Sequence, residues 1–209
     1  EYNAENNRTA LYSKGVKCRT YEYDKDERIK RIKNQFGEEF VISYDDLGLR
    51  KEILYPNGIA AVFEYCEFQK LCKLTIRQLK GSVLKTFCYA YDETGSLEEV
   101  TEDGNRTVRY TYDNLGRLKT IIEGNGRTCS YEYDPAGNRI GMKGFDGKAI
   151  RYNYNVANQL VRAGERAIEY DLNGNILSMS YGDRIASFAY DENKFLIEVK
   201  IDGKETVKY

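Results

Sequence analysis

Residues 110–118 read YTYDNLGRL, and this stretch carries the pattern that decides the fold. Tyr110 and Tyr112 are two residues apart, which places both side chains on one face of a β-strand. Asp113 and Gly116 occupy the first and fourth positions of a four-residue turn. Aspartate accepts hydrogen bonds from backbone N–H groups there, and glycine takes positive φ without a steric cost. The stretch therefore predicts two antiparallel strands joined by a tight turn.

The same pattern fills the chain. A tyrosine followed by an acidic or amide residue begins most copies, Tyr65-Cys66 begins a degenerate copy, and most anchors lie 21 residues apart. A regular period of this length indicates a repeat protein. We expect a single array of about ten hairpin repeats over residues 1–209. The anchors are Tyr2, Tyr23, Tyr44, Tyr65, Tyr91, Tyr112, Tyr133, Tyr154, Tyr170, Tyr190 and, beginning an eleventh copy, Tyr209.

A second class of turn separates the copies. Asn-Gly and Asp-Gly pairs favour two-residue type I′ turns, which need positive φ at both positions. Such pairs occur at Asn57-Gly58, Asp103-Gly104, Asp146-Gly147 and Asp202-Gly203. Hairpins centred on these pairs would place a tyrosine opposite the sixth residue after the preceding anchor. The expected pairs are Arg50 with Tyr65, Leu97 with Tyr110, Arg139 with Tyr154 and Leu196 with Tyr209.

The strands are expected to have one aromatic and one polar face. The sixth residue after an anchor should be the cross-strand neighbour of that tyrosine. It is leucine or isoleucine in most copies and otherwise an arginine that can stack on the ring, namely Arg8, Arg50 or Arg139. The aromatic face collects, among others, Phe40, Ile42, Tyr44, Phe63, Tyr65, Phe87, Tyr89, Tyr91, Val108, Ile168 and Phe188. The polar face collects Thr111, Glu132, Asn153, Glu169 and Lys208.

The fold class is therefore an all-β, repetitive antiparallel hairpin meander of about twenty strands of about six residues each. Open sheets of more than ~10 strands curl or split. We expect a curved or spiralling sheet that forms part of a shell or barrel. A single-layer sheet cannot bury the ~70–75% of its surface that a compact protein of this size buries. Such a chain either closes on itself, pairs with another copy or belongs to a larger shell.

Composition excludes several classes of function. Lysine plus arginine total 32 against 33 acidic residues, so there is no positive field for nucleic acid or a membrane surface. The chain has no histidine, which excludes catalytic triads built on imidazole. No stretch is apolar enough to span a membrane, and the N-terminus has no signal-peptide pattern, which predicts a soluble chain.

Five cysteines without CxxC spacing argue against a disulfide framework or a zinc knuckle. We interpret all of them as small apolar residues of the interior. They are Cys18, Cys66, Cys72, Cys88 and Cys129.

No catalytic, cofactor-binding or metal-binding residue is predicted, and binding residues are left unassigned. The adjacent acids Asp45-Asp46, Glu38-Glu39 and Glu98-Glu99 should point to opposite faces and so not converge as a glycosidase pair would. We interpret the glycine-rich segment 141–147 and the acidic segment 171–175 as hairpin turns, not as phosphate or calcium loops. Two glycosylation sequons, at Asn7 and Asn105, would matter only in a eukaryotic secretory pathway.

The motifs YDNLGRL, YDPAGNR, YDLNGNI and YNVANQL resemble the YD repeats of the Rhs family. That family includes bacterial Rhs polymorphic toxins, wall-associated proteins, insecticidal toxin-complex C subunits and animal teneurins, and the resemblance covers essentially the whole chain. It implies a hairpin ribbon that spirals into a hollow shell around a C-terminal toxin domain, or a barrel in an adhesion receptor. Residues 134–138 are the nearest match to the family's self-cleaving DPxGL motif. They lack its leucine and lie in an ordinary repeat turn, so no protease is inferred.

We therefore expect a non-enzymatic wall segment of a large secreted or cell-surface protein. Its expected partners are neighbouring YD repeats or an enclosed C-terminal domain of the same polypeptide, with self-association through open strand edges. The alternative is a carbohydrate- or cell-surface-binding module that uses exposed tyrosines. An enzyme is the third hypothesis, and it requires two or more acids that converge in one closed pocket. No nucleic acid, membrane insertion or cofactor is expected.

Overall fold

The structure is a computed structural model that describes residues 1–208. Over these residues the chain forms twenty β-strands and one short 3-10 helix, which confirms the all-β prediction and the expected strand number. The strands are β1 (Ala10–Ser13), β2 (Val16–Tyr23), β3 (Ile29–Asn34), β4 (Glu39–Tyr44), β5 (Arg50–Leu54), β6 (Ile59–Tyr65), β7 (Leu71–Gln78), β8 (Val83–Tyr91), β9 (Leu97–Glu102), β10 (Arg106–Tyr112), β11 (Leu118–Glu123), β12 (Thr128–Tyr133), β13 (Arg139–Lys143), β14 (Ala149–Tyr154), β15 (Leu160–Ala163), β16 (Arg166–Tyr170), β17 (Ile176–Tyr181), β18 (Arg184–Tyr190), β19 (Leu196–Ile201) and β20 (Lys204–Lys208); the helix η1 is Glu67–Gln69.

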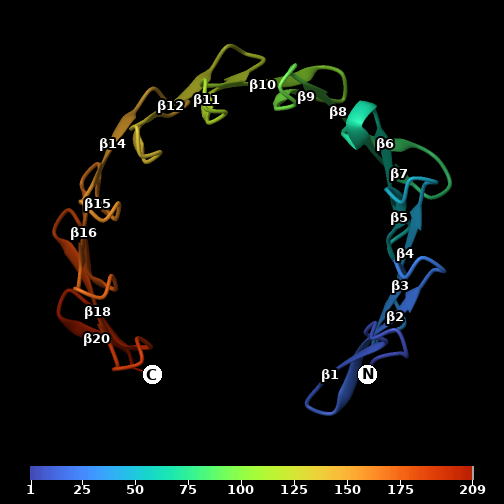
Figure 1. The fold of residues 1–209 in the computed structure, drawn as a ribbon, viewed down its shortest axis with the longest axis horizontal. Helices are drawn as coiled ribbons and strands as arrows, with labels where there is room; N and C mark the ends of the chain where they lie inside the picture. The colour runs from blue at the N-terminus through green and yellow to red at the C-terminus, as the bar shows by residue number, and fades with distance from the viewer. Residues whose placement is uncertain (209) are drawn as a thin grey trace. The chain divides into compact units, whose positions relative to one another are not determined.

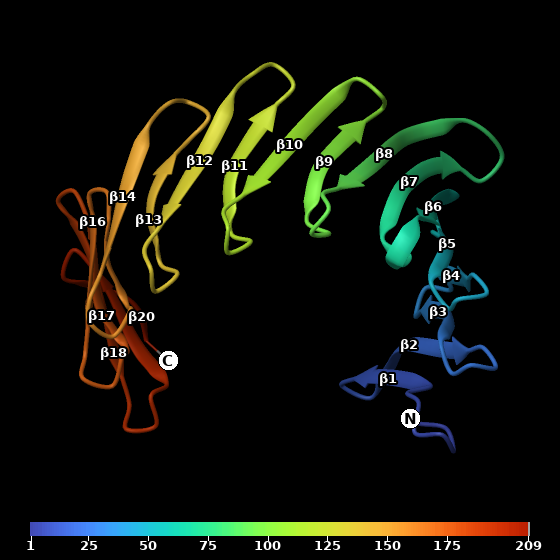
Figure 2. The ribbon, with the colours of Figure 1, turned by 45° about the horizontal axis from the view of Figure 1, so that its top comes forward.

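The chain divides into two compact units, one formed by Glu1–Arg109 and the other beginning at Tyr110. In the first unit each strand from β1 to β9 pairs antiparallel with the strand that follows it in the chain, which for β9 is the first part of β10. In the second unit the strands from β11 to β20 pair in the same way. Within each unit the hairpins stand side by side in chain order (Figure 1, Figure 2). Each unit is thus a meander, as predicted.

The turns after the anchor tyrosines, called YD turns below, have the predicted form. In the turn that begins at Asp92, the N–H of Gly95 donates to the Asp92 carbonyl and the N–H of Asp92 donates to the Ser96 carbonyl, both at 2.9 Å. Gly95 has a φ of 86°. Leu97, the sixth residue after the anchor, lies opposite Tyr91 as predicted. The same pairing holds for Tyr23 with Ile29, Tyr44 with Arg50, Tyr65 with Leu71, Tyr133 with Arg139, Tyr154 with Leu160, Tyr170 with Ile176 and Tyr190 with Leu196.

The predicted type I′ turns are half correct. Both residues have positive φ at Asp103-Gly104 (51° and 73°) and at Asp202-Gly203 (52° and 77°). At Asn57-Gly58 and Asp146-Gly147 the prediction was wrong, because only the glycine has positive φ. These two are four-residue turns with the glycine last, and Gly58 donates to the carbonyl of Tyr55 at 3.0 Å. The physical reason at the first is Pro56, whose fixed φ suits the second position of such a turn.

The predicted register across the second class of turn was also wrong, by one residue. Glu99 pairs with Arg109 and Val100 with Val108, which is inconsistent with the expected pair of Leu97 and Tyr110. The pairs Arg50 with Tyr65 and Arg139 with Tyr154 also fail by one residue, with the register shifted in the opposite direction. The fourth pair, Leu196 with Tyr209, lies outside the described residues. An extra residue at each of these turns causes the shift.

The predicted aromatic and polar faces are nevertheless present, because a β-bulge compensates for the one-residue shift in register. A β-bulge follows the YD turns of the anchors Tyr23, Tyr44, Tyr65, Tyr91, Tyr133, Tyr154, Tyr170 and Tyr190. Tyr91, for example, pairs with Leu97, whereas Ala90 pairs with Glu99. The bulge keeps the aromatic residues on one face across successive strands. Phe63, Leu74 and Phe87 lie in one cross-strand row, and Tyr89, Val100 and Val108 lie in another. The opposite face carries rows such as Glu132, Gly141 and Arg151.

The sheet has little interior. Among the described residues the buried apolar side chains are Ala10, Ala60, Ala61 and Cys129, and no large side chain is fully buried. The surface is 14756 Å², whereas a compact protein of this mass would expose about 10,000 Å². The side chains of the aromatic face are therefore only partly buried, by contact with one another. Another part of a protein could still pack on this face.

The interpretation of all five cysteines as apolar interior residues was wrong. Cys66 and Cys72 form a disulfide, and Cys88 is exposed. Cys129 is buried, as expected. A spacing of six residues does not predict this disulfide. The two cysteines come together only because a turn and a β-bulge lie between them.

Candidate functional site: the junctions between repeats

The aspartate of each YD turn organises the turn with its side chain. Oδ1 of Asp113 accepts the N–H of Leu115 at 2.9 Å and the N–H of Arg117 at 3.0 Å. A carboxylate in this position satisfies two donors that the turn leaves unpaired. Both bonds recur at Asp24, Asp45, Asp92, Asn155, Asp171 and Asp191.

These hydrogen bonds lower the pKa of the turn carboxyls. The N–H of Arg117 holds the pKa of Asp113 below its usual value. The side-chain amides of Asn138 and Asn175 do the same for Asp134 and Asp171, because hydrogen bonds to a carboxylate favour its charged form. Asp113, Asp134 and Asp171 are thus ionised structural groups.

In two repeats the fifth residue after the anchor is an arginine that links its turn to the next repeat. Nε of Arg117 donates to Oδ2 of Asp113 at 2.7 Å, and the same guanidinium lies 4.7 Å from the centre of the Tyr133 ring. Arg28 bridges Asp24 and Tyr44 in the same way, with its guanidinium 4.5 Å from the ring centre. A cation over an aromatic ring is attracted by the negative face of the ring. One side chain therefore closes a turn and contacts the following hairpin.

The anchor tyrosines form a second link, in the opposite direction along the chain. The hydroxyl of Tyr133 donates to the carbonyl of Leu118, the sixth residue after the preceding anchor, at 2.9 Å. The β-bulge disrupts the ladder beside this carbonyl, which leaves it able to accept. The equivalent bonds are Tyr23 to Arg8, Tyr44 to Ile29, Tyr65 to Arg50, Tyr91 to Leu71, Tyr154 to Arg139 and Tyr170 to Leu160.

Burial raises the pKa of Tyr65 and of Tyr89, which keeps these hydroxyls protonated. A protonated hydroxyl can donate, as the Tyr65 hydroxyl does to the carbonyl of Arg50 at 2.9 Å. The anchor tyrosines from Tyr23 to Tyr190 are half-buried, which fits a structural role.

The opposite edge of the sheet has its own link. The N–H of Asp103 donates to the carbonyl of Thr86, and the N–H of Thr86 donates to Oδ1 of Asp103, both at 2.8 Å. Asp202 and Ile185 exchange the same two bonds, at 2.8 and 2.9 Å. The two aspartates with positive φ therefore join successive hairpins at the edge away from the YD turns.

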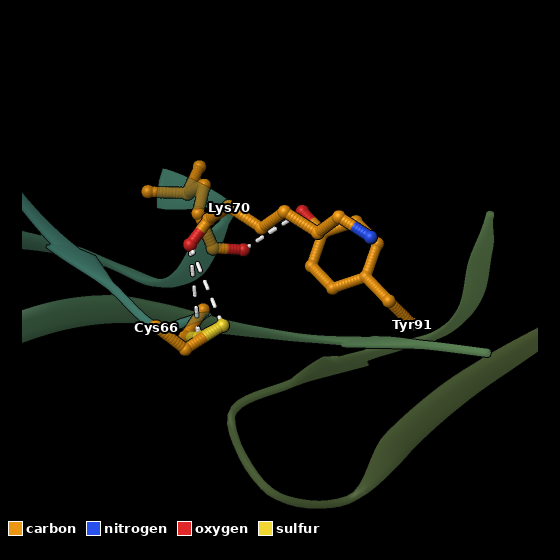
Figure 3. Close-up of a disulfide and its surroundings, with 5 residues drawn as sticks. Cys66, Lys70 and Tyr91 are labelled. Atoms are coloured by element: carbon orange, nitrogen blue, oxygen red, sulfur yellow. Dashed lines mark hydrogen bonds between the residues drawn. A yellow bond between two sulfur atoms is a disulfide. The ribbon is translucent and has the colours of Figure 1, made fainter. Parts of the chain in front are cut away.

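One repeat departs from this design, at the turn between β6 and β7. Cys66 takes the place of the aspartate and Gln69 the place of the glycine. Cys66 forms a disulfide with Cys72, with the Cα atoms 5.6 Å apart. Both sulfur atoms lie near the Lys70 carbonyl oxygen, at 3.5 and 3.7 Å, and the Lys70 ammonium lies over the Tyr91 ring (Figure 3).

The residues considered for catalysis do not converge. Asp45 is a turn residue, Glu39 pairs with Lys33 at 3.1 Å, and Glu99 pairs with Arg109 at 2.7 Å. Segment 144–147 is a four-residue turn and Asp171 is a turn residue, which confirms both turn interpretations. Over residues 1–208 no group of three or more acids and cysteines is placed to hold a metal ion. No helix in this described part is long and apolar enough to cross a membrane.

Sequence reasoning missed the tyrosine bonds, the edge aspartates and the disulfide. The signal for the first was present: the anchor is a tyrosine in every copy and never a phenylalanine. A packing role alone would tolerate either residue, so the constant hydroxyl indicated a hydrogen bond. The carbonyl that accepts it lies on a strand brought near only by the fold.

The chain is thus a repeat protein. Its turn aspartates order the turns, and its anchor tyrosines and edge aspartates join one hairpin to the next. The family model for the teneurin YD-shell matches residues 1–143 and 91–209, which together cover the chain. The chain belongs to the teneurin YD-shell family and is a structural shell segment of it. No curated protein matches the sequence.

Solved structures show the same fold. A crystal structure of TcdB2-TccC3 matches with a TM-score of 0.70 and 14% identity, over 89% of this chain and 11% of that one. The Photorhabdus luminescens Tc holotoxin pore, with the mutation TccC3-D651A, matches with 0.61 and 12%, over 91% and 13%. TcdB2-TccC3 without its hypervariable C-terminal region matches with 0.62 and 13%, over 87% and 13%. The chain therefore spans about an eighth or less of the structures it resembles.

Proposed function

We propose that this chain is a non-enzymatic segment of the wall of a β-shell, and that the shell encloses a C-terminal domain of the same polypeptide. In this proposal residues 1–209 are one repeat array within a larger, secreted or cell-surface protein. The observation that carries it is the junction geometry. The turn aspartates and the anchor tyrosine hydroxyls are hydrogen-bonded within the sheet, so the repeats use their polar groups to build a wall.

The exposed surface supports the same proposal. With 14756 Å² exposed, the sheet has roughly 5,000 Å² more surface than a compact protein of its mass. An excess of total surface of this size is expected of an open sheet whose face another part of a protein covers. A neighbouring layer of repeats and an enclosed domain would provide that cover.

Two further observations bear on the cargo and the compartment. One of the matched structures is described as lacking its hypervariable C-terminal region, which suggests by analogy what a shell of this fold holds. The Cys66–Cys72 disulfide is of the kind that persists in an oxidising, extracellular compartment.

The test is protease protection in the full-length polypeptide. The region that follows the repeats should resist proteinase K while the wall is intact. It should be cleaved at least tenfold faster when Tyr44, Tyr133 and Tyr154 are replaced by alanine. Equal cleavage of the following region in the intact protein and in an isolated C-terminal fragment would contradict enclosure.

A binding module is the second candidate, and one observation favours it. Tyr181 is 61% exposed and borders a shallow hollow of about 390 Å³ lined by Met179, Ile185 and Ile201. An exposed ring beside an apolar wall can stack on a sugar. Saturable binding on a glycan array or to cell walls, lost in Tyr181→Ala and kept in Tyr55→Ala, would favour this function over a purely structural one.

A further inference from the structure

The turn at residues 66–70 lacks both chemical features of a YD turn. A cysteine sulfur is only a weak acceptor, so Cys66 is a poor substitute for the carboxylate that accepts two backbone N–H groups in other repeats. Phe68 and Gln69 have positive φ, 59° and 60°, without being glycine. Side chains with a Cβ disfavour this conformation. This turn therefore needs another source of order.

The disulfide is placed to supply that order. Tyr65 pairs with Leu71 and Glu64 with Lys73, so Cys72 is the bulged residue between them. The equivalent bulged residue is Lys30 or Lys51 in two other repeats and Glu98, Ile140 or Val161 in three more. The bond from Cys66 to Cys72 thus joins the aspartate position to the bulge and closes the turn covalently, where hydrogen bonds close the others.

The same turn is connected to the next repeat. The Lys70 ammonium lies 4.9 Å from the centre of the Tyr91 ring, and the Tyr91 hydroxyl donates to the Leu71 carbonyl at 2.9 Å (Figure 3). Both contacts come from residues enclosed by the disulfide loop. Disorder in this loop would therefore loosen the Tyr91 junction as well.

We propose that the Cys66–Cys72 disulfide replaces the turn aspartate, whose carboxylate caps the turn by accepting two backbone N–H groups. The junction between this turn and the next repeat is then sensitive to reduction. A dithiol reductant breaks the S–S bond, the two cysteines gain two electrons and two protons as thiols, and the dithiol becomes a disulfide. Cys66 is exposed, which gives the reductant access. The reduced turn has neither cap nor glycine, so it opens locally, and the other YD turns stay closed because their caps are not redox-active.

The test measures backbone hydrogen exchange by mass spectrometry on the whole chain. Free thiols are first blocked with N-ethylmaleimide, so that dithiothreitol acts on the disulfide only, and alkylation mapping verifies reduction. We expect exchange in residues 66–71 to rise ~10- to 50-fold, with a smaller rise around Tyr91. The peptide that covers the turn at 113–116 should not change.

A variant with a restored YD turn distinguishes the effect of losing the disulfide in this turn from a general loss of stability. The triple substitution Cys66→Asp, Gln69→Gly and Cys72→Lys restores the sequence features of the other repeats. Its turn should be protected to the level of the oxidised protein with or without dithiothreitol. Cys66→Ala with Cys72→Ala should show the fast exchange of the reduced protein under both conditions.

Unchanged exchange at 66–71 after verified reduction would overturn the proposal. So would a variant with the restored YD turn that exchanges as fast as the double alanine variant, because the cap and the disulfide would then not be equivalent. If reduction raised exchange throughout the chain, the disulfide would be a global staple, which also contradicts a local junction switch.

Discussion

At the scale of single residues, the YD turn depends on two residues with different roles, the aspartate and the residue three positions later. The aspartate binds backbone N–H groups, and the later residue takes positive φ. Glycine takes this conformation freely, but Lys194 has a φ of 66° and Glu27 a φ of 60°. These repeats have the turn without its preferred residue, and they should be the less stable ones.

Replacing Lys194 with glycine should therefore stabilise the protein by about 1 kcal/mol, because the side chain no longer opposes the left-handed backbone. Urea unfolding measures the change. Gly116→Ala is the converse control: no atom lies within 4 Å of an added Cβ, so its expected loss of about 1 kcal/mol comes from backbone strain. A loss of stability in Lys194→Gly would contradict this account of the turn.

The turn carboxyls predict a loss of stability in acid. The pKa of Asp113 is lowered in the folded state by the N–H of Arg117, and those of Asp134 and Asp171 by Asn138 and Asn175. A folded pKa below the unfolded value of about 3.9 gives stability above that pH, and this stability is lost as the pH falls through the folded pKa. The melting temperature should therefore fall between pH 5 and pH 2. Asp113→Asn keeps an acceptor oxygen but has no titrating group, so its melting temperature should fall less. An equal fall would mean that the Asp113 carboxyl does not contribute to the loss of stability in acid.

At the scale of the element, the unit of construction is the junction between hairpins and not the hairpin alone. A two-stranded hairpin is marginal in water. The tyrosine hydroxyls, the stacked arginines and the edge aspartates each connect a hairpin to its neighbour. This is the nearest-neighbour stabilisation expected of repeat proteins.

Tyr133→Phe tests the tyrosine link, because it removes only the hydroxyl that donates to the Leu118 carbonyl. We expect a loss of about 1 kcal/mol in urea unfolding, the usual net value of a hydrogen bond. Tyr181→Phe is the control, since this residue is 61% exposed, and its effect should stay within about 0.5 kcal/mol. Equal losses in the two variants would mean that the hydroxyl bond adds nothing.

At the scale of the whole molecule, the missing interior is the dominant fact. Among the described residues no large side chain is fully buried, several are exposed, such as Phe36 and Phe68, and the buried apolar ones are small. Stability per residue should be low for a chain of this size, since apolar burial is the main favourable contribution to folding.

Calorimetry can measure this deficit directly. A compact protein of 209 residues would have a heat-capacity change of unfolding of about 2.5–3.1 kcal/mol/K. Because much of the surface is exposed before unfolding, we expect a value clearly below about 2.5 kcal/mol/K. A value of about 3 kcal/mol/K would mean that the isolated chain buries its aromatic face, by self-association or rearrangement.

The local features were readable from the sequence because each depends on neighbouring residues. Asp113 and Gly116 predict their turn by themselves, and the pairing of each anchor with the sixth residue follows from that turn. The register across Asn57-Gly58 failed because a turn dipeptide admits more than one loop length, and Pro56 favoured the longer one. The aromatic face was predicted correctly because the β-bulges after the YD turns restored the alternation that the wrong register would have broken.

By itself the sequence determined the repeat, the strand number, the YD turns and the family, since all of these follow from local spacing and backbone preference. Only the tertiary structure decided which groups join one repeat to the next. The bond from Tyr133 to Leu118, the exchange between Asp103 and Thr86, and the Cys66–Cys72 disulfide each depend on where bulges and turns place atoms across strands. A displacement of one residue would break any of them, and spacing along the chain does not specify position to that accuracy.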